Sequence, residues 1–168
     1  MEPFVPDSLL VIFGQLSLAL LLGLLLGTER SVVAGKRAGS RTFALVALGS
    51  CLFTVTGIQV THSYLGLINF DPMRIAAAII TGIGFIGAGI IIFRGDELKG
   101  LTTAAGLWVS SGIGIATAFG LYAIAIFSTL LALLAFTALW FIEDRLKFWT
   151  DTTKKAPVVV EREEGEER

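Results

Sequence analysis

Residues Ser8–Thr28 read SLLVIFGQLSLALLLGLLLGT, a run without a single charged side chain. A helix of about 20 apolar residues crosses the roughly 30 Å hydrocarbon core of a bilayer. Three more uncharged runs follow, at Thr42–Phe70, Ile75–Phe93 and Leu101–Ile142. The last would be about 63 Å long as one helix, twice the thickness of the core, so it must contain two spans. The sequence therefore predicts an all-α polytopic bundle of about five transmembrane helices.

The composition of the whole chain agrees with this prediction. Of the 168 residues, 54% are hydrophobic and 16% are charged, whereas an ordinary soluble domain has roughly 25% charged residues. The expected surroundings are the lipid bilayer and other membrane proteins, and nucleic acid is not an expected partner. We predict one transmembrane domain over residues 1–147. The tail over residues 148–168 is highly charged, and we expect it to be disordered and cytoplasmic.

Local signals place some of the helix ends. Asp71-Pro72 is typical of a helix cap followed by proline at the first helical position. Gly112, Gly114 and Gly120 mark the region in which the chain turns between the fourth and fifth spans, although the pattern does not decide which of them lies in the loop.

The orientation follows from the basic residues, because cytoplasmic loops accumulate lysine and arginine. With five spans and the N-terminus outside, only Arg74 among the basic residues lies on the outer side. The cytoplasmic segments then hold Arg30, Lys36, Arg37, Arg41, Arg94, Lys99 and every basic residue after Ile142. We therefore predict an outside N-terminus and a cytoplasmic C-terminus.

The third span contains AAAIITGIGFIGAG over residues 76–89, in which small residues recur at helical spacing. Small residues let transmembrane helices approach closely. We therefore expect this helix to lie centrally and to contact two neighbours, or one neighbour and a second subunit in a homodimer. Two faces carry the small residues: Ala77, Thr81, Gly84 and Ala88 on one, and Ala78, Gly82 and Gly89 on the other. Gly82, Gly84 and Gly87 also fit G-x-G-x-x-G, but no strand precedes them as the nucleotide motif requires.

Charged residues at the ends of the spans are candidates for function, because ionisable groups beside hydrocarbon are costly. Glu29 lies at a helix C-terminus and Arg74 at a helix N-terminus, and both positions are unfavourable in the helix dipole. We expect Asp71 to pair with Arg74, and Glu29 to pair with Arg30, Arg41 or Arg94. The candidate functional network comprises Glu29, Arg30, Arg41, Asp71, Arg74, Arg94, Thr102 and Thr103.

No enzyme, metal site or cofactor is predicted. The one histidine, His62, is expected on the side opposite the hydroxyls of Ser110 and Ser111, so no serine–histidine pair is indicated. We interpret those hydroxyls, like Thr102 and Thr103, as helix caps or interhelical hydrogen-bonding groups. Cys51, the single cysteine, is interpreted as a small packing residue.

Five short motifs, taken in order, resemble the membrane domain of the MgtC/SapB family. They are Gly27-Thr-Glu-Arg30, Ala38-Gly-Ser-Arg-Thr42, Asp71-Pro-Met-Arg74, Gly82–Gly89, and Gly100-Leu-Thr-Thr-Ala-Ala105 with Trp108. The resemblance implies a protein of the bacterial inner membrane. It also implies a role in growth under magnesium limitation, exerted on other membrane machinery such as the proton-translocating ATP synthase.

Two features depart from the family pattern. The best-known members carry a soluble C-terminal domain and act in survival inside macrophages, and we expect this chain, which stops soon after its last span, to lack that role. Phe43 stands where many relatives have histidine, which removes a titratable group and with it support for pH sensing.

Two function hypotheses follow. The first is a small regulatory membrane protein that contacts other membrane proteins. The alternative is a transporter or channel for magnesium, potassium or protons. No Asp or Glu lies within a predicted span, so Glu29 and Asp71, at span edges, are the carboxylates available to a magnesium ion.

Overall fold

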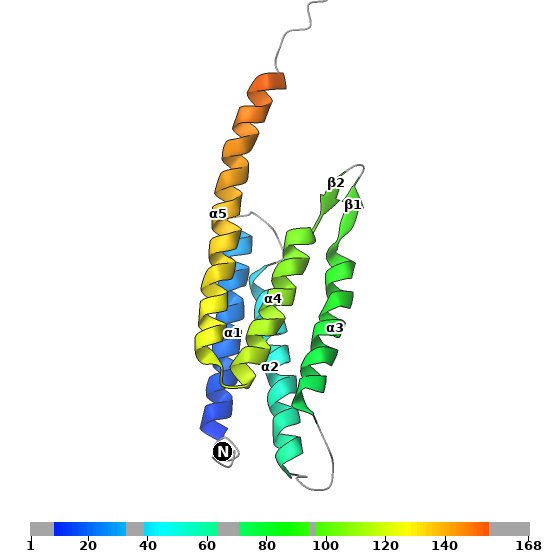
Figure 1. The fold of residues 1–168 in the computed structure, drawn as a ribbon, viewed down its shortest axis with the longest axis vertical. Coiled ribbons are helices and arrows are strands. Elements are labelled where there is room, and N and C mark those ends of the chain that lie inside the picture. Colours follow the sequence, from blue (N-terminus) through cyan, green and yellow to red (C-terminus); the bar gives the residue numbers. More distant parts are fainter. Residues whose placement is uncertain (1–8, 33–38, 64–70, 95–96, 155–168) are drawn as a thin grey trace, which may run out of the picture.

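The computed structural model describes residues 9–32, 39–63, 71–94 and 97–154, which form a bundle of helices with one short hairpin (Figure 1). The helices are α1 (Leu9–Val32), α2 (Ser40–Ser63), α3 (Pro72–Ile90), α4 (Leu101–Ala118) and α5 (Tyr122–Lys154). Helices α1 to α4 are each long and apolar enough to cross a membrane, and α5 contains a shorter apolar segment, Tyr122–Ala138. The predicted all-α bundle of about five helices is confirmed.

The turn between α4 and α5 depends on one of the three predicted glycines. Gly120 has φ +73°, a left-handed conformation that glycine adopts without steric cost. The N–H groups of Phe119 and Leu121 donate to the carbonyls of Ile115 and Ala116, at 3.1 and 2.9 Å, which closes the end of α4. Gly112 and Gly114 lie inside α4, so they are not loop residues.

The start of α3 agrees with the sequence, but its end does not. Asp71 is the N-cap, with its side chain accepting the Met73 N–H at 2.9 Å, and Pro72 is the first helical residue. The helix stops at Ile90, short of the predicted Phe93. Strand β1 (Ile92–Arg94) then pairs antiparallel with β2 (Glu97–Lys99). Gly100, at φ +95°, packs against the Ile90 carbonyl and leads directly into α4, so the hairpin fixes α3 beside α4.

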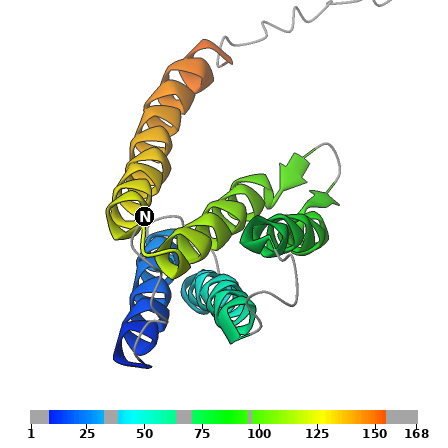
Figure 2. The same cartoon turned by 60° about the horizontal axis from the view of Figure 1, so that its bottom comes forward.

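Helix α4 lies at the centre of the bundle, because it contacts α1, α2, α3 and α5 (Figure 2). Two of its glycines permit this. A Cβ on Gly106 would collide with Phe43 and Phe136, and one on Gly114 would collide with the Ala47 backbone. The prediction that the third span is central is therefore wrong within a single chain.

Helix α3 lies at the edge, in contact with α2 and α4. All six of its predicted packing residues are exposed: Ala77, Thr81, Gly82, Gly84, Ala88 and Gly89. A Cβ added to any of the three glycines among them would meet nothing within 4 Å. The predicted contact of these residues with a second subunit stays a prediction.

The bundle has an apolar exterior as well as an apolar core. Its main core cluster includes Leu26, Phe43 and Leu107, all fully buried. Large apolar side chains also cover the outside, among them Phe85 with 84% and Leu10 with 82% of its surface exposed. Water would disfavour such a surface, whereas lipid tails match it.

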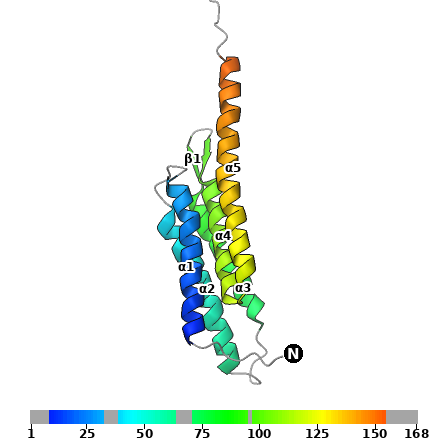
Figure 3. The ribbon, with the colours of Figure 1, turned by 90° about the vertical axis from the view of Figure 1, so that its left-hand side faces the viewer.

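Helix α5 extends past the rest of the bundle (Figures 1 and 3). Its 33 residues give a length of about 50 Å, well over the roughly 30 Å of a bilayer core. The helix continues to Lys154, and thus into the segment over 148–168 that was predicted to be a disordered tail. Residues 155–168 lie outside the described residues.

Candidate functional site

A buried arginine connects three helices at one end of the bundle. Arg30, near the end of α1, is 9% exposed. Its Nη2 donates to Thr103 Oγ1 in the first turn of α4, at 3.1 Å. Its guanidinium carbon lies 5.2 Å from the centroid of the Phe136 ring on α5, within the range of a cation–π interaction. Arg30 therefore holds α1, α4 and α5 together through its charge.

Glycine provides the space for this arrangement. Gly106 follows Thr103 by three residues, so both lie on the same face of α4. A Cβ on Gly106 would lie 2.7 Å from Phe136 and 2.8 Å from Phe43, closer than real Cβ contacts allow. Any larger residue at position 106 would push the Phe136 ring away from its place below Arg30.

Three of the sequence motifs meet around this arginine. Gly27 of α1 packs against Gly39 and Ser40 at the start of α2, and a Cβ on Gly39 would lie 2.6 Å from the Gly27 carbonyl oxygen. This close approach anchors the C-terminal end of α1 to α2. The motifs that contain Gly27, Gly39 and Thr103 thus come together in space, although the sequence only placed them in order.

Glu29 is the second ionisable group in this region, and it is 8% exposed. Its Oε2 is buried without a hydrogen-bond partner in the described part of the chain, as is Nε of Arg30. The described side chain of Arg41 makes no ion pair with Glu29, whereas the positive charge of Arg30 acts electrostatically on the Glu29 carboxylate. The side chain of Arg94 lies outside the described residues. A buried carboxylate oxygen without a hydrogen bond is costly, which makes Glu29 a functional candidate.

The other predicted residues do not join Glu29 and Arg30 in one network. Arg41 and Thr102 are exposed at the same end of the bundle, whereas Asp71 and Arg74 are exposed at the start of α3, at the opposite end (Figure 1). Asp71 caps α3 instead of pairing with Arg74, and the described residues contain no ion pair between the two side chains. The predicted functional residues thus form two separate groups, one at each end of the bundle.

The hydroxyls of α4 link it to α2. Ser111 Oγ lies 3.0 Å from Ser50 Oγ, and Ser110 Oγ donates to the Phe43 carbonyl at 2.9 Å. The interpretation of these serines as interhelical hydrogen-bonding groups is confirmed. Gln15 was missed: its Nε2 donates to the Ala118 carbonyl at 3.3 Å, which joins α1 to the end of α4. Its position as the one amide in the first uncharged run could have indicated it.

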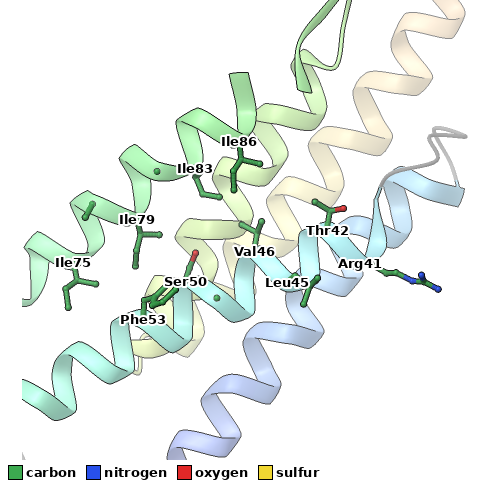
Figure 4. Close-up of a pocket in the computed structure, with 13 residues that line it drawn as sticks. Arg41, Thr42, Leu45, Val46, Ser50, Phe53, Ile75, Ile79, Ile83 and Ile86 are labelled. Atoms are coloured by element: carbon green, nitrogen blue, oxygen red, sulfur yellow. The ribbon is translucent and has the colours of Figure 1, made fainter. Parts of the chain in front are cut away.

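An apolar groove between α2 and α3 was not predicted (Figure 4). Its volume is about 850 Å³. It runs along α2 from Arg41 to Phe53 and along α3 from Ile75 to Ile86. The main lining side chains are aliphatic: Leu45, Val46, Ile75, Ile79, Ile83 and Ile86. We call this the α2–α3 groove.

The fold and its apolar surface define a helical membrane protein with a buried arginine at one end. The model of the MgtC family matches residues 16–145, most of the chain, and the chain belongs to this family. No solved structure matches it.

Several curated proteins are similar over the same region. Protein SapB of Bacillus subtilis is 38% identical over 133 residues, covering 77% of this chain and 55% of that protein. Protein MgtC of Salmonella typhimurium is 42% identical over 117 residues, covering 70% and 47%. A putative magnesium transporter of Escherichia coli, YhiD, is 42% identical over 111 residues, covering 65% and 51%. The chain thus spans about half the length of these relatives.

Proposed function

We propose that this protein is a multi-pass regulatory protein of the bacterial inner membrane that supports adaptation to magnesium limitation by contacting other membrane proteins. Membership of the MgtC family supports the link to magnesium, as does the name of the similar Escherichia coli protein, putative magnesium transporter. Regulation through contacts with other membrane proteins is supported by the positions of the small residues in the bundle.

Five glycines on α1, α2 and α4 pack against other helices of the same chain, whereas Gly14, Gly49 and Gly112 on those helices meet nothing within 4 Å. Gly23 and Gly27 of α1 approach the α2 backbone, Gly57 of α2 receives Ile75, and Gly106 and Gly114 of α4 receive α2 and α5. The α3 face of Ala77, Thr81, Gly84 and Ala88 is exposed instead. Because lipid gives helices no hydrophobic reason to associate, close packing on small residues is a main source of helix affinity in membranes. The exposure of these small residues on α3 is the observation that supports the proposal.

Gly84→Leu tests the proposal. Gly84 is exposed, and a Cβ there would meet nothing within 4 Å, so we expect the detergent-solubilised variant to unfold at about the wild-type temperature. The variant should nevertheless fail to restore growth at limiting magnesium in cells that lack the protein, and should lose its crosslinks to membrane partners or to a second copy.

Gly14→Leu is the matched control, because Gly14 on α1 is also exposed with nothing within 4 Å. It should restore growth fully. Full restoration by Gly84→Leu, with its crosslinks unchanged, would contradict the proposal.

Cation transport is a second candidate function, and the buried carboxylate of Glu29 supports it. This carboxylate is buried near the end of α1 with Oε2 unpaired, and a cation could satisfy it. Magnesium in proteins is bound through one or two carboxylates and several retained waters, and Glu29 would supply one such ligand.

A further inference from the structure

We propose that the α2–α3 groove holds one acyl chain of an anionic phospholipid, whose headgroup is bound by Arg41. The two ends of the groove differ, and this difference indicates both parts of the ligand. Arg41 and Thr42 lie at one end, whereas Ile75 and Phe53 lie at the other (Figure 4). A ligand along this groove must therefore be charged or polar at one end and apolar along its length.

The dimensions fit one lipid chain. From Arg41 to Phe53 the groove follows about 18 Å of helix, close to the roughly 15 Å depth of one leaflet. The groove closes where Ile75 packs into the space left by Gly57. An acyl chain can taper into this narrow end.

Charge determines the class of headgroup. Arg41 is exposed, and in the part of the chain that the structure describes no hydrogen bond or ion pair engages its side chain. A guanidinium presents a planar fork of donors that matches phosphate oxygens. Thr42, also on the groove, adds a hydroxyl at the same end. The pair complements the phosphate of an anionic lipid at the level where headgroups lie.

The test measures lipid retained by the delipidated full-length protein in detergent after incubation with phosphatidylglycerol or phosphatidylcholine of the same chains, by native mass spectrometry. We expect one phosphatidylglycerol per chain, preferred about fivefold over phosphatidylcholine, the effect of one basic residue near anionic lipid. Arg41→Gln should abolish the preference, and Arg41→Lys should restore much of it.

Gly82→Leu tests the acyl part, because Gly82 lines the groove and has open space around its Cβ. It should lower retention of both lipids several-fold. Ala78→Leu, in the same groove, is a second such variant. Gly14→Leu, which changes an exposed glycine of α1 outside the groove, is the control and should retain lipid as wild type does.

Three results would overturn the proposal. The first is equal retention of the two lipids by the wild type. The second is unchanged retention in folded Gly82→Leu and Ala78→Leu. The third is a fall in assembly mass, with no loss of lipid, in those variants, which would assign the groove to a second copy of the chain.

Discussion

Replacing Gly114 with alanine is expected to lower the free energy of unfolding by about 3 kcal/mol, the upper part of the range for overpacking a well-packed core. The added methyl would collide with the Ala47 carbonyl and lie 3.0 Å from Ser50 Cβ. A backbone carbonyl inside a helix cannot move aside as a flexible side chain can, so α2 and α4 would have to separate. Separation would also break the Ser50–Ser111 hydrogen bond.

Gly112→Ala is the matched control, two residues earlier on the same helix. Its new methyl would meet nothing within 4 Å, so the unfolding free energy should rise by up to about 1 kcal/mol, the helix propensity that alanine gains over glycine. Both variants gain the same helix propensity, which favours alanine over glycine. Unfolding in a denaturing detergent titration measures the difference, and equal stability of the two variants would show that α2 and α4 do not cross at Gly114.

Arg30→Ala is the second change with a large expected effect. The variant loses a charged hydrogen bond, worth about 1.5–3 kcal/mol, and a buried cation–π contact, worth up to about 2 kcal/mol. Part of this loss is offset, because the variant no longer has the free-energy cost of removing a guanidinium from water. We therefore expect a net loss of about 3 kcal/mol in unfolding free energy. Glu29, already buried, would also lose its neighbouring positive charge.

Graded variants separate these contributions. Arg30→Lys keeps the charge but loses the planar group over Phe136, so it should fall between wild type and Arg30→Ala. Thr103→Val removes only the acceptor of the Arg30 hydrogen bond, whereas Thr102→Val changes an exposed neighbour and should have little effect. Arg74→Ala, at an exposed helix start, is the control for loss of an arginine. Similar melting temperatures for the Arg30 and Arg74 variants would contradict the role assigned to Arg30.

The uncharged runs predicted the number and approximate limits of the helices, because a bilayer imposes a length on each span. They could not predict which helix lies at the centre. Small-residue spacing is alike in α3 and α4, but only the fold decides that Gly114 faces Ala47 while Gly84 faces outward. The β1–β2 hairpin was missed because its three-residue strands lie within and just beyond an apolar run that extends α3 in sequence.

The candidate site was predicted in part for a similar reason. The dipole and bilayer arguments selected Glu29, which the structure buries, because they depend only on local position along a helix. The partners of Arg30 lie 73 and 106 positions away, at Thr103 and Phe136, and one sequence carries no signal for such distant contacts. Ion pairs chosen by proximity in sequence, such as Asp71 with Arg74, were therefore wrong.

Magnesium flux into proteoliposomes of the purified protein tests the central claim of regulation by contact most directly. Vesicles with wild type, Glu29→Gln or Asp71→Asn would be compared with protein-free vesicles under an imposed magnesium gradient, and repeated with potassium and proton gradients. The account predicts that flux in all three equals the protein-free leak. Flux that rises with the amount of wild-type protein, and is lost in Glu29→Gln but kept in Asp71→Asn, would contradict it and assign the buried carboxylate to a transport site.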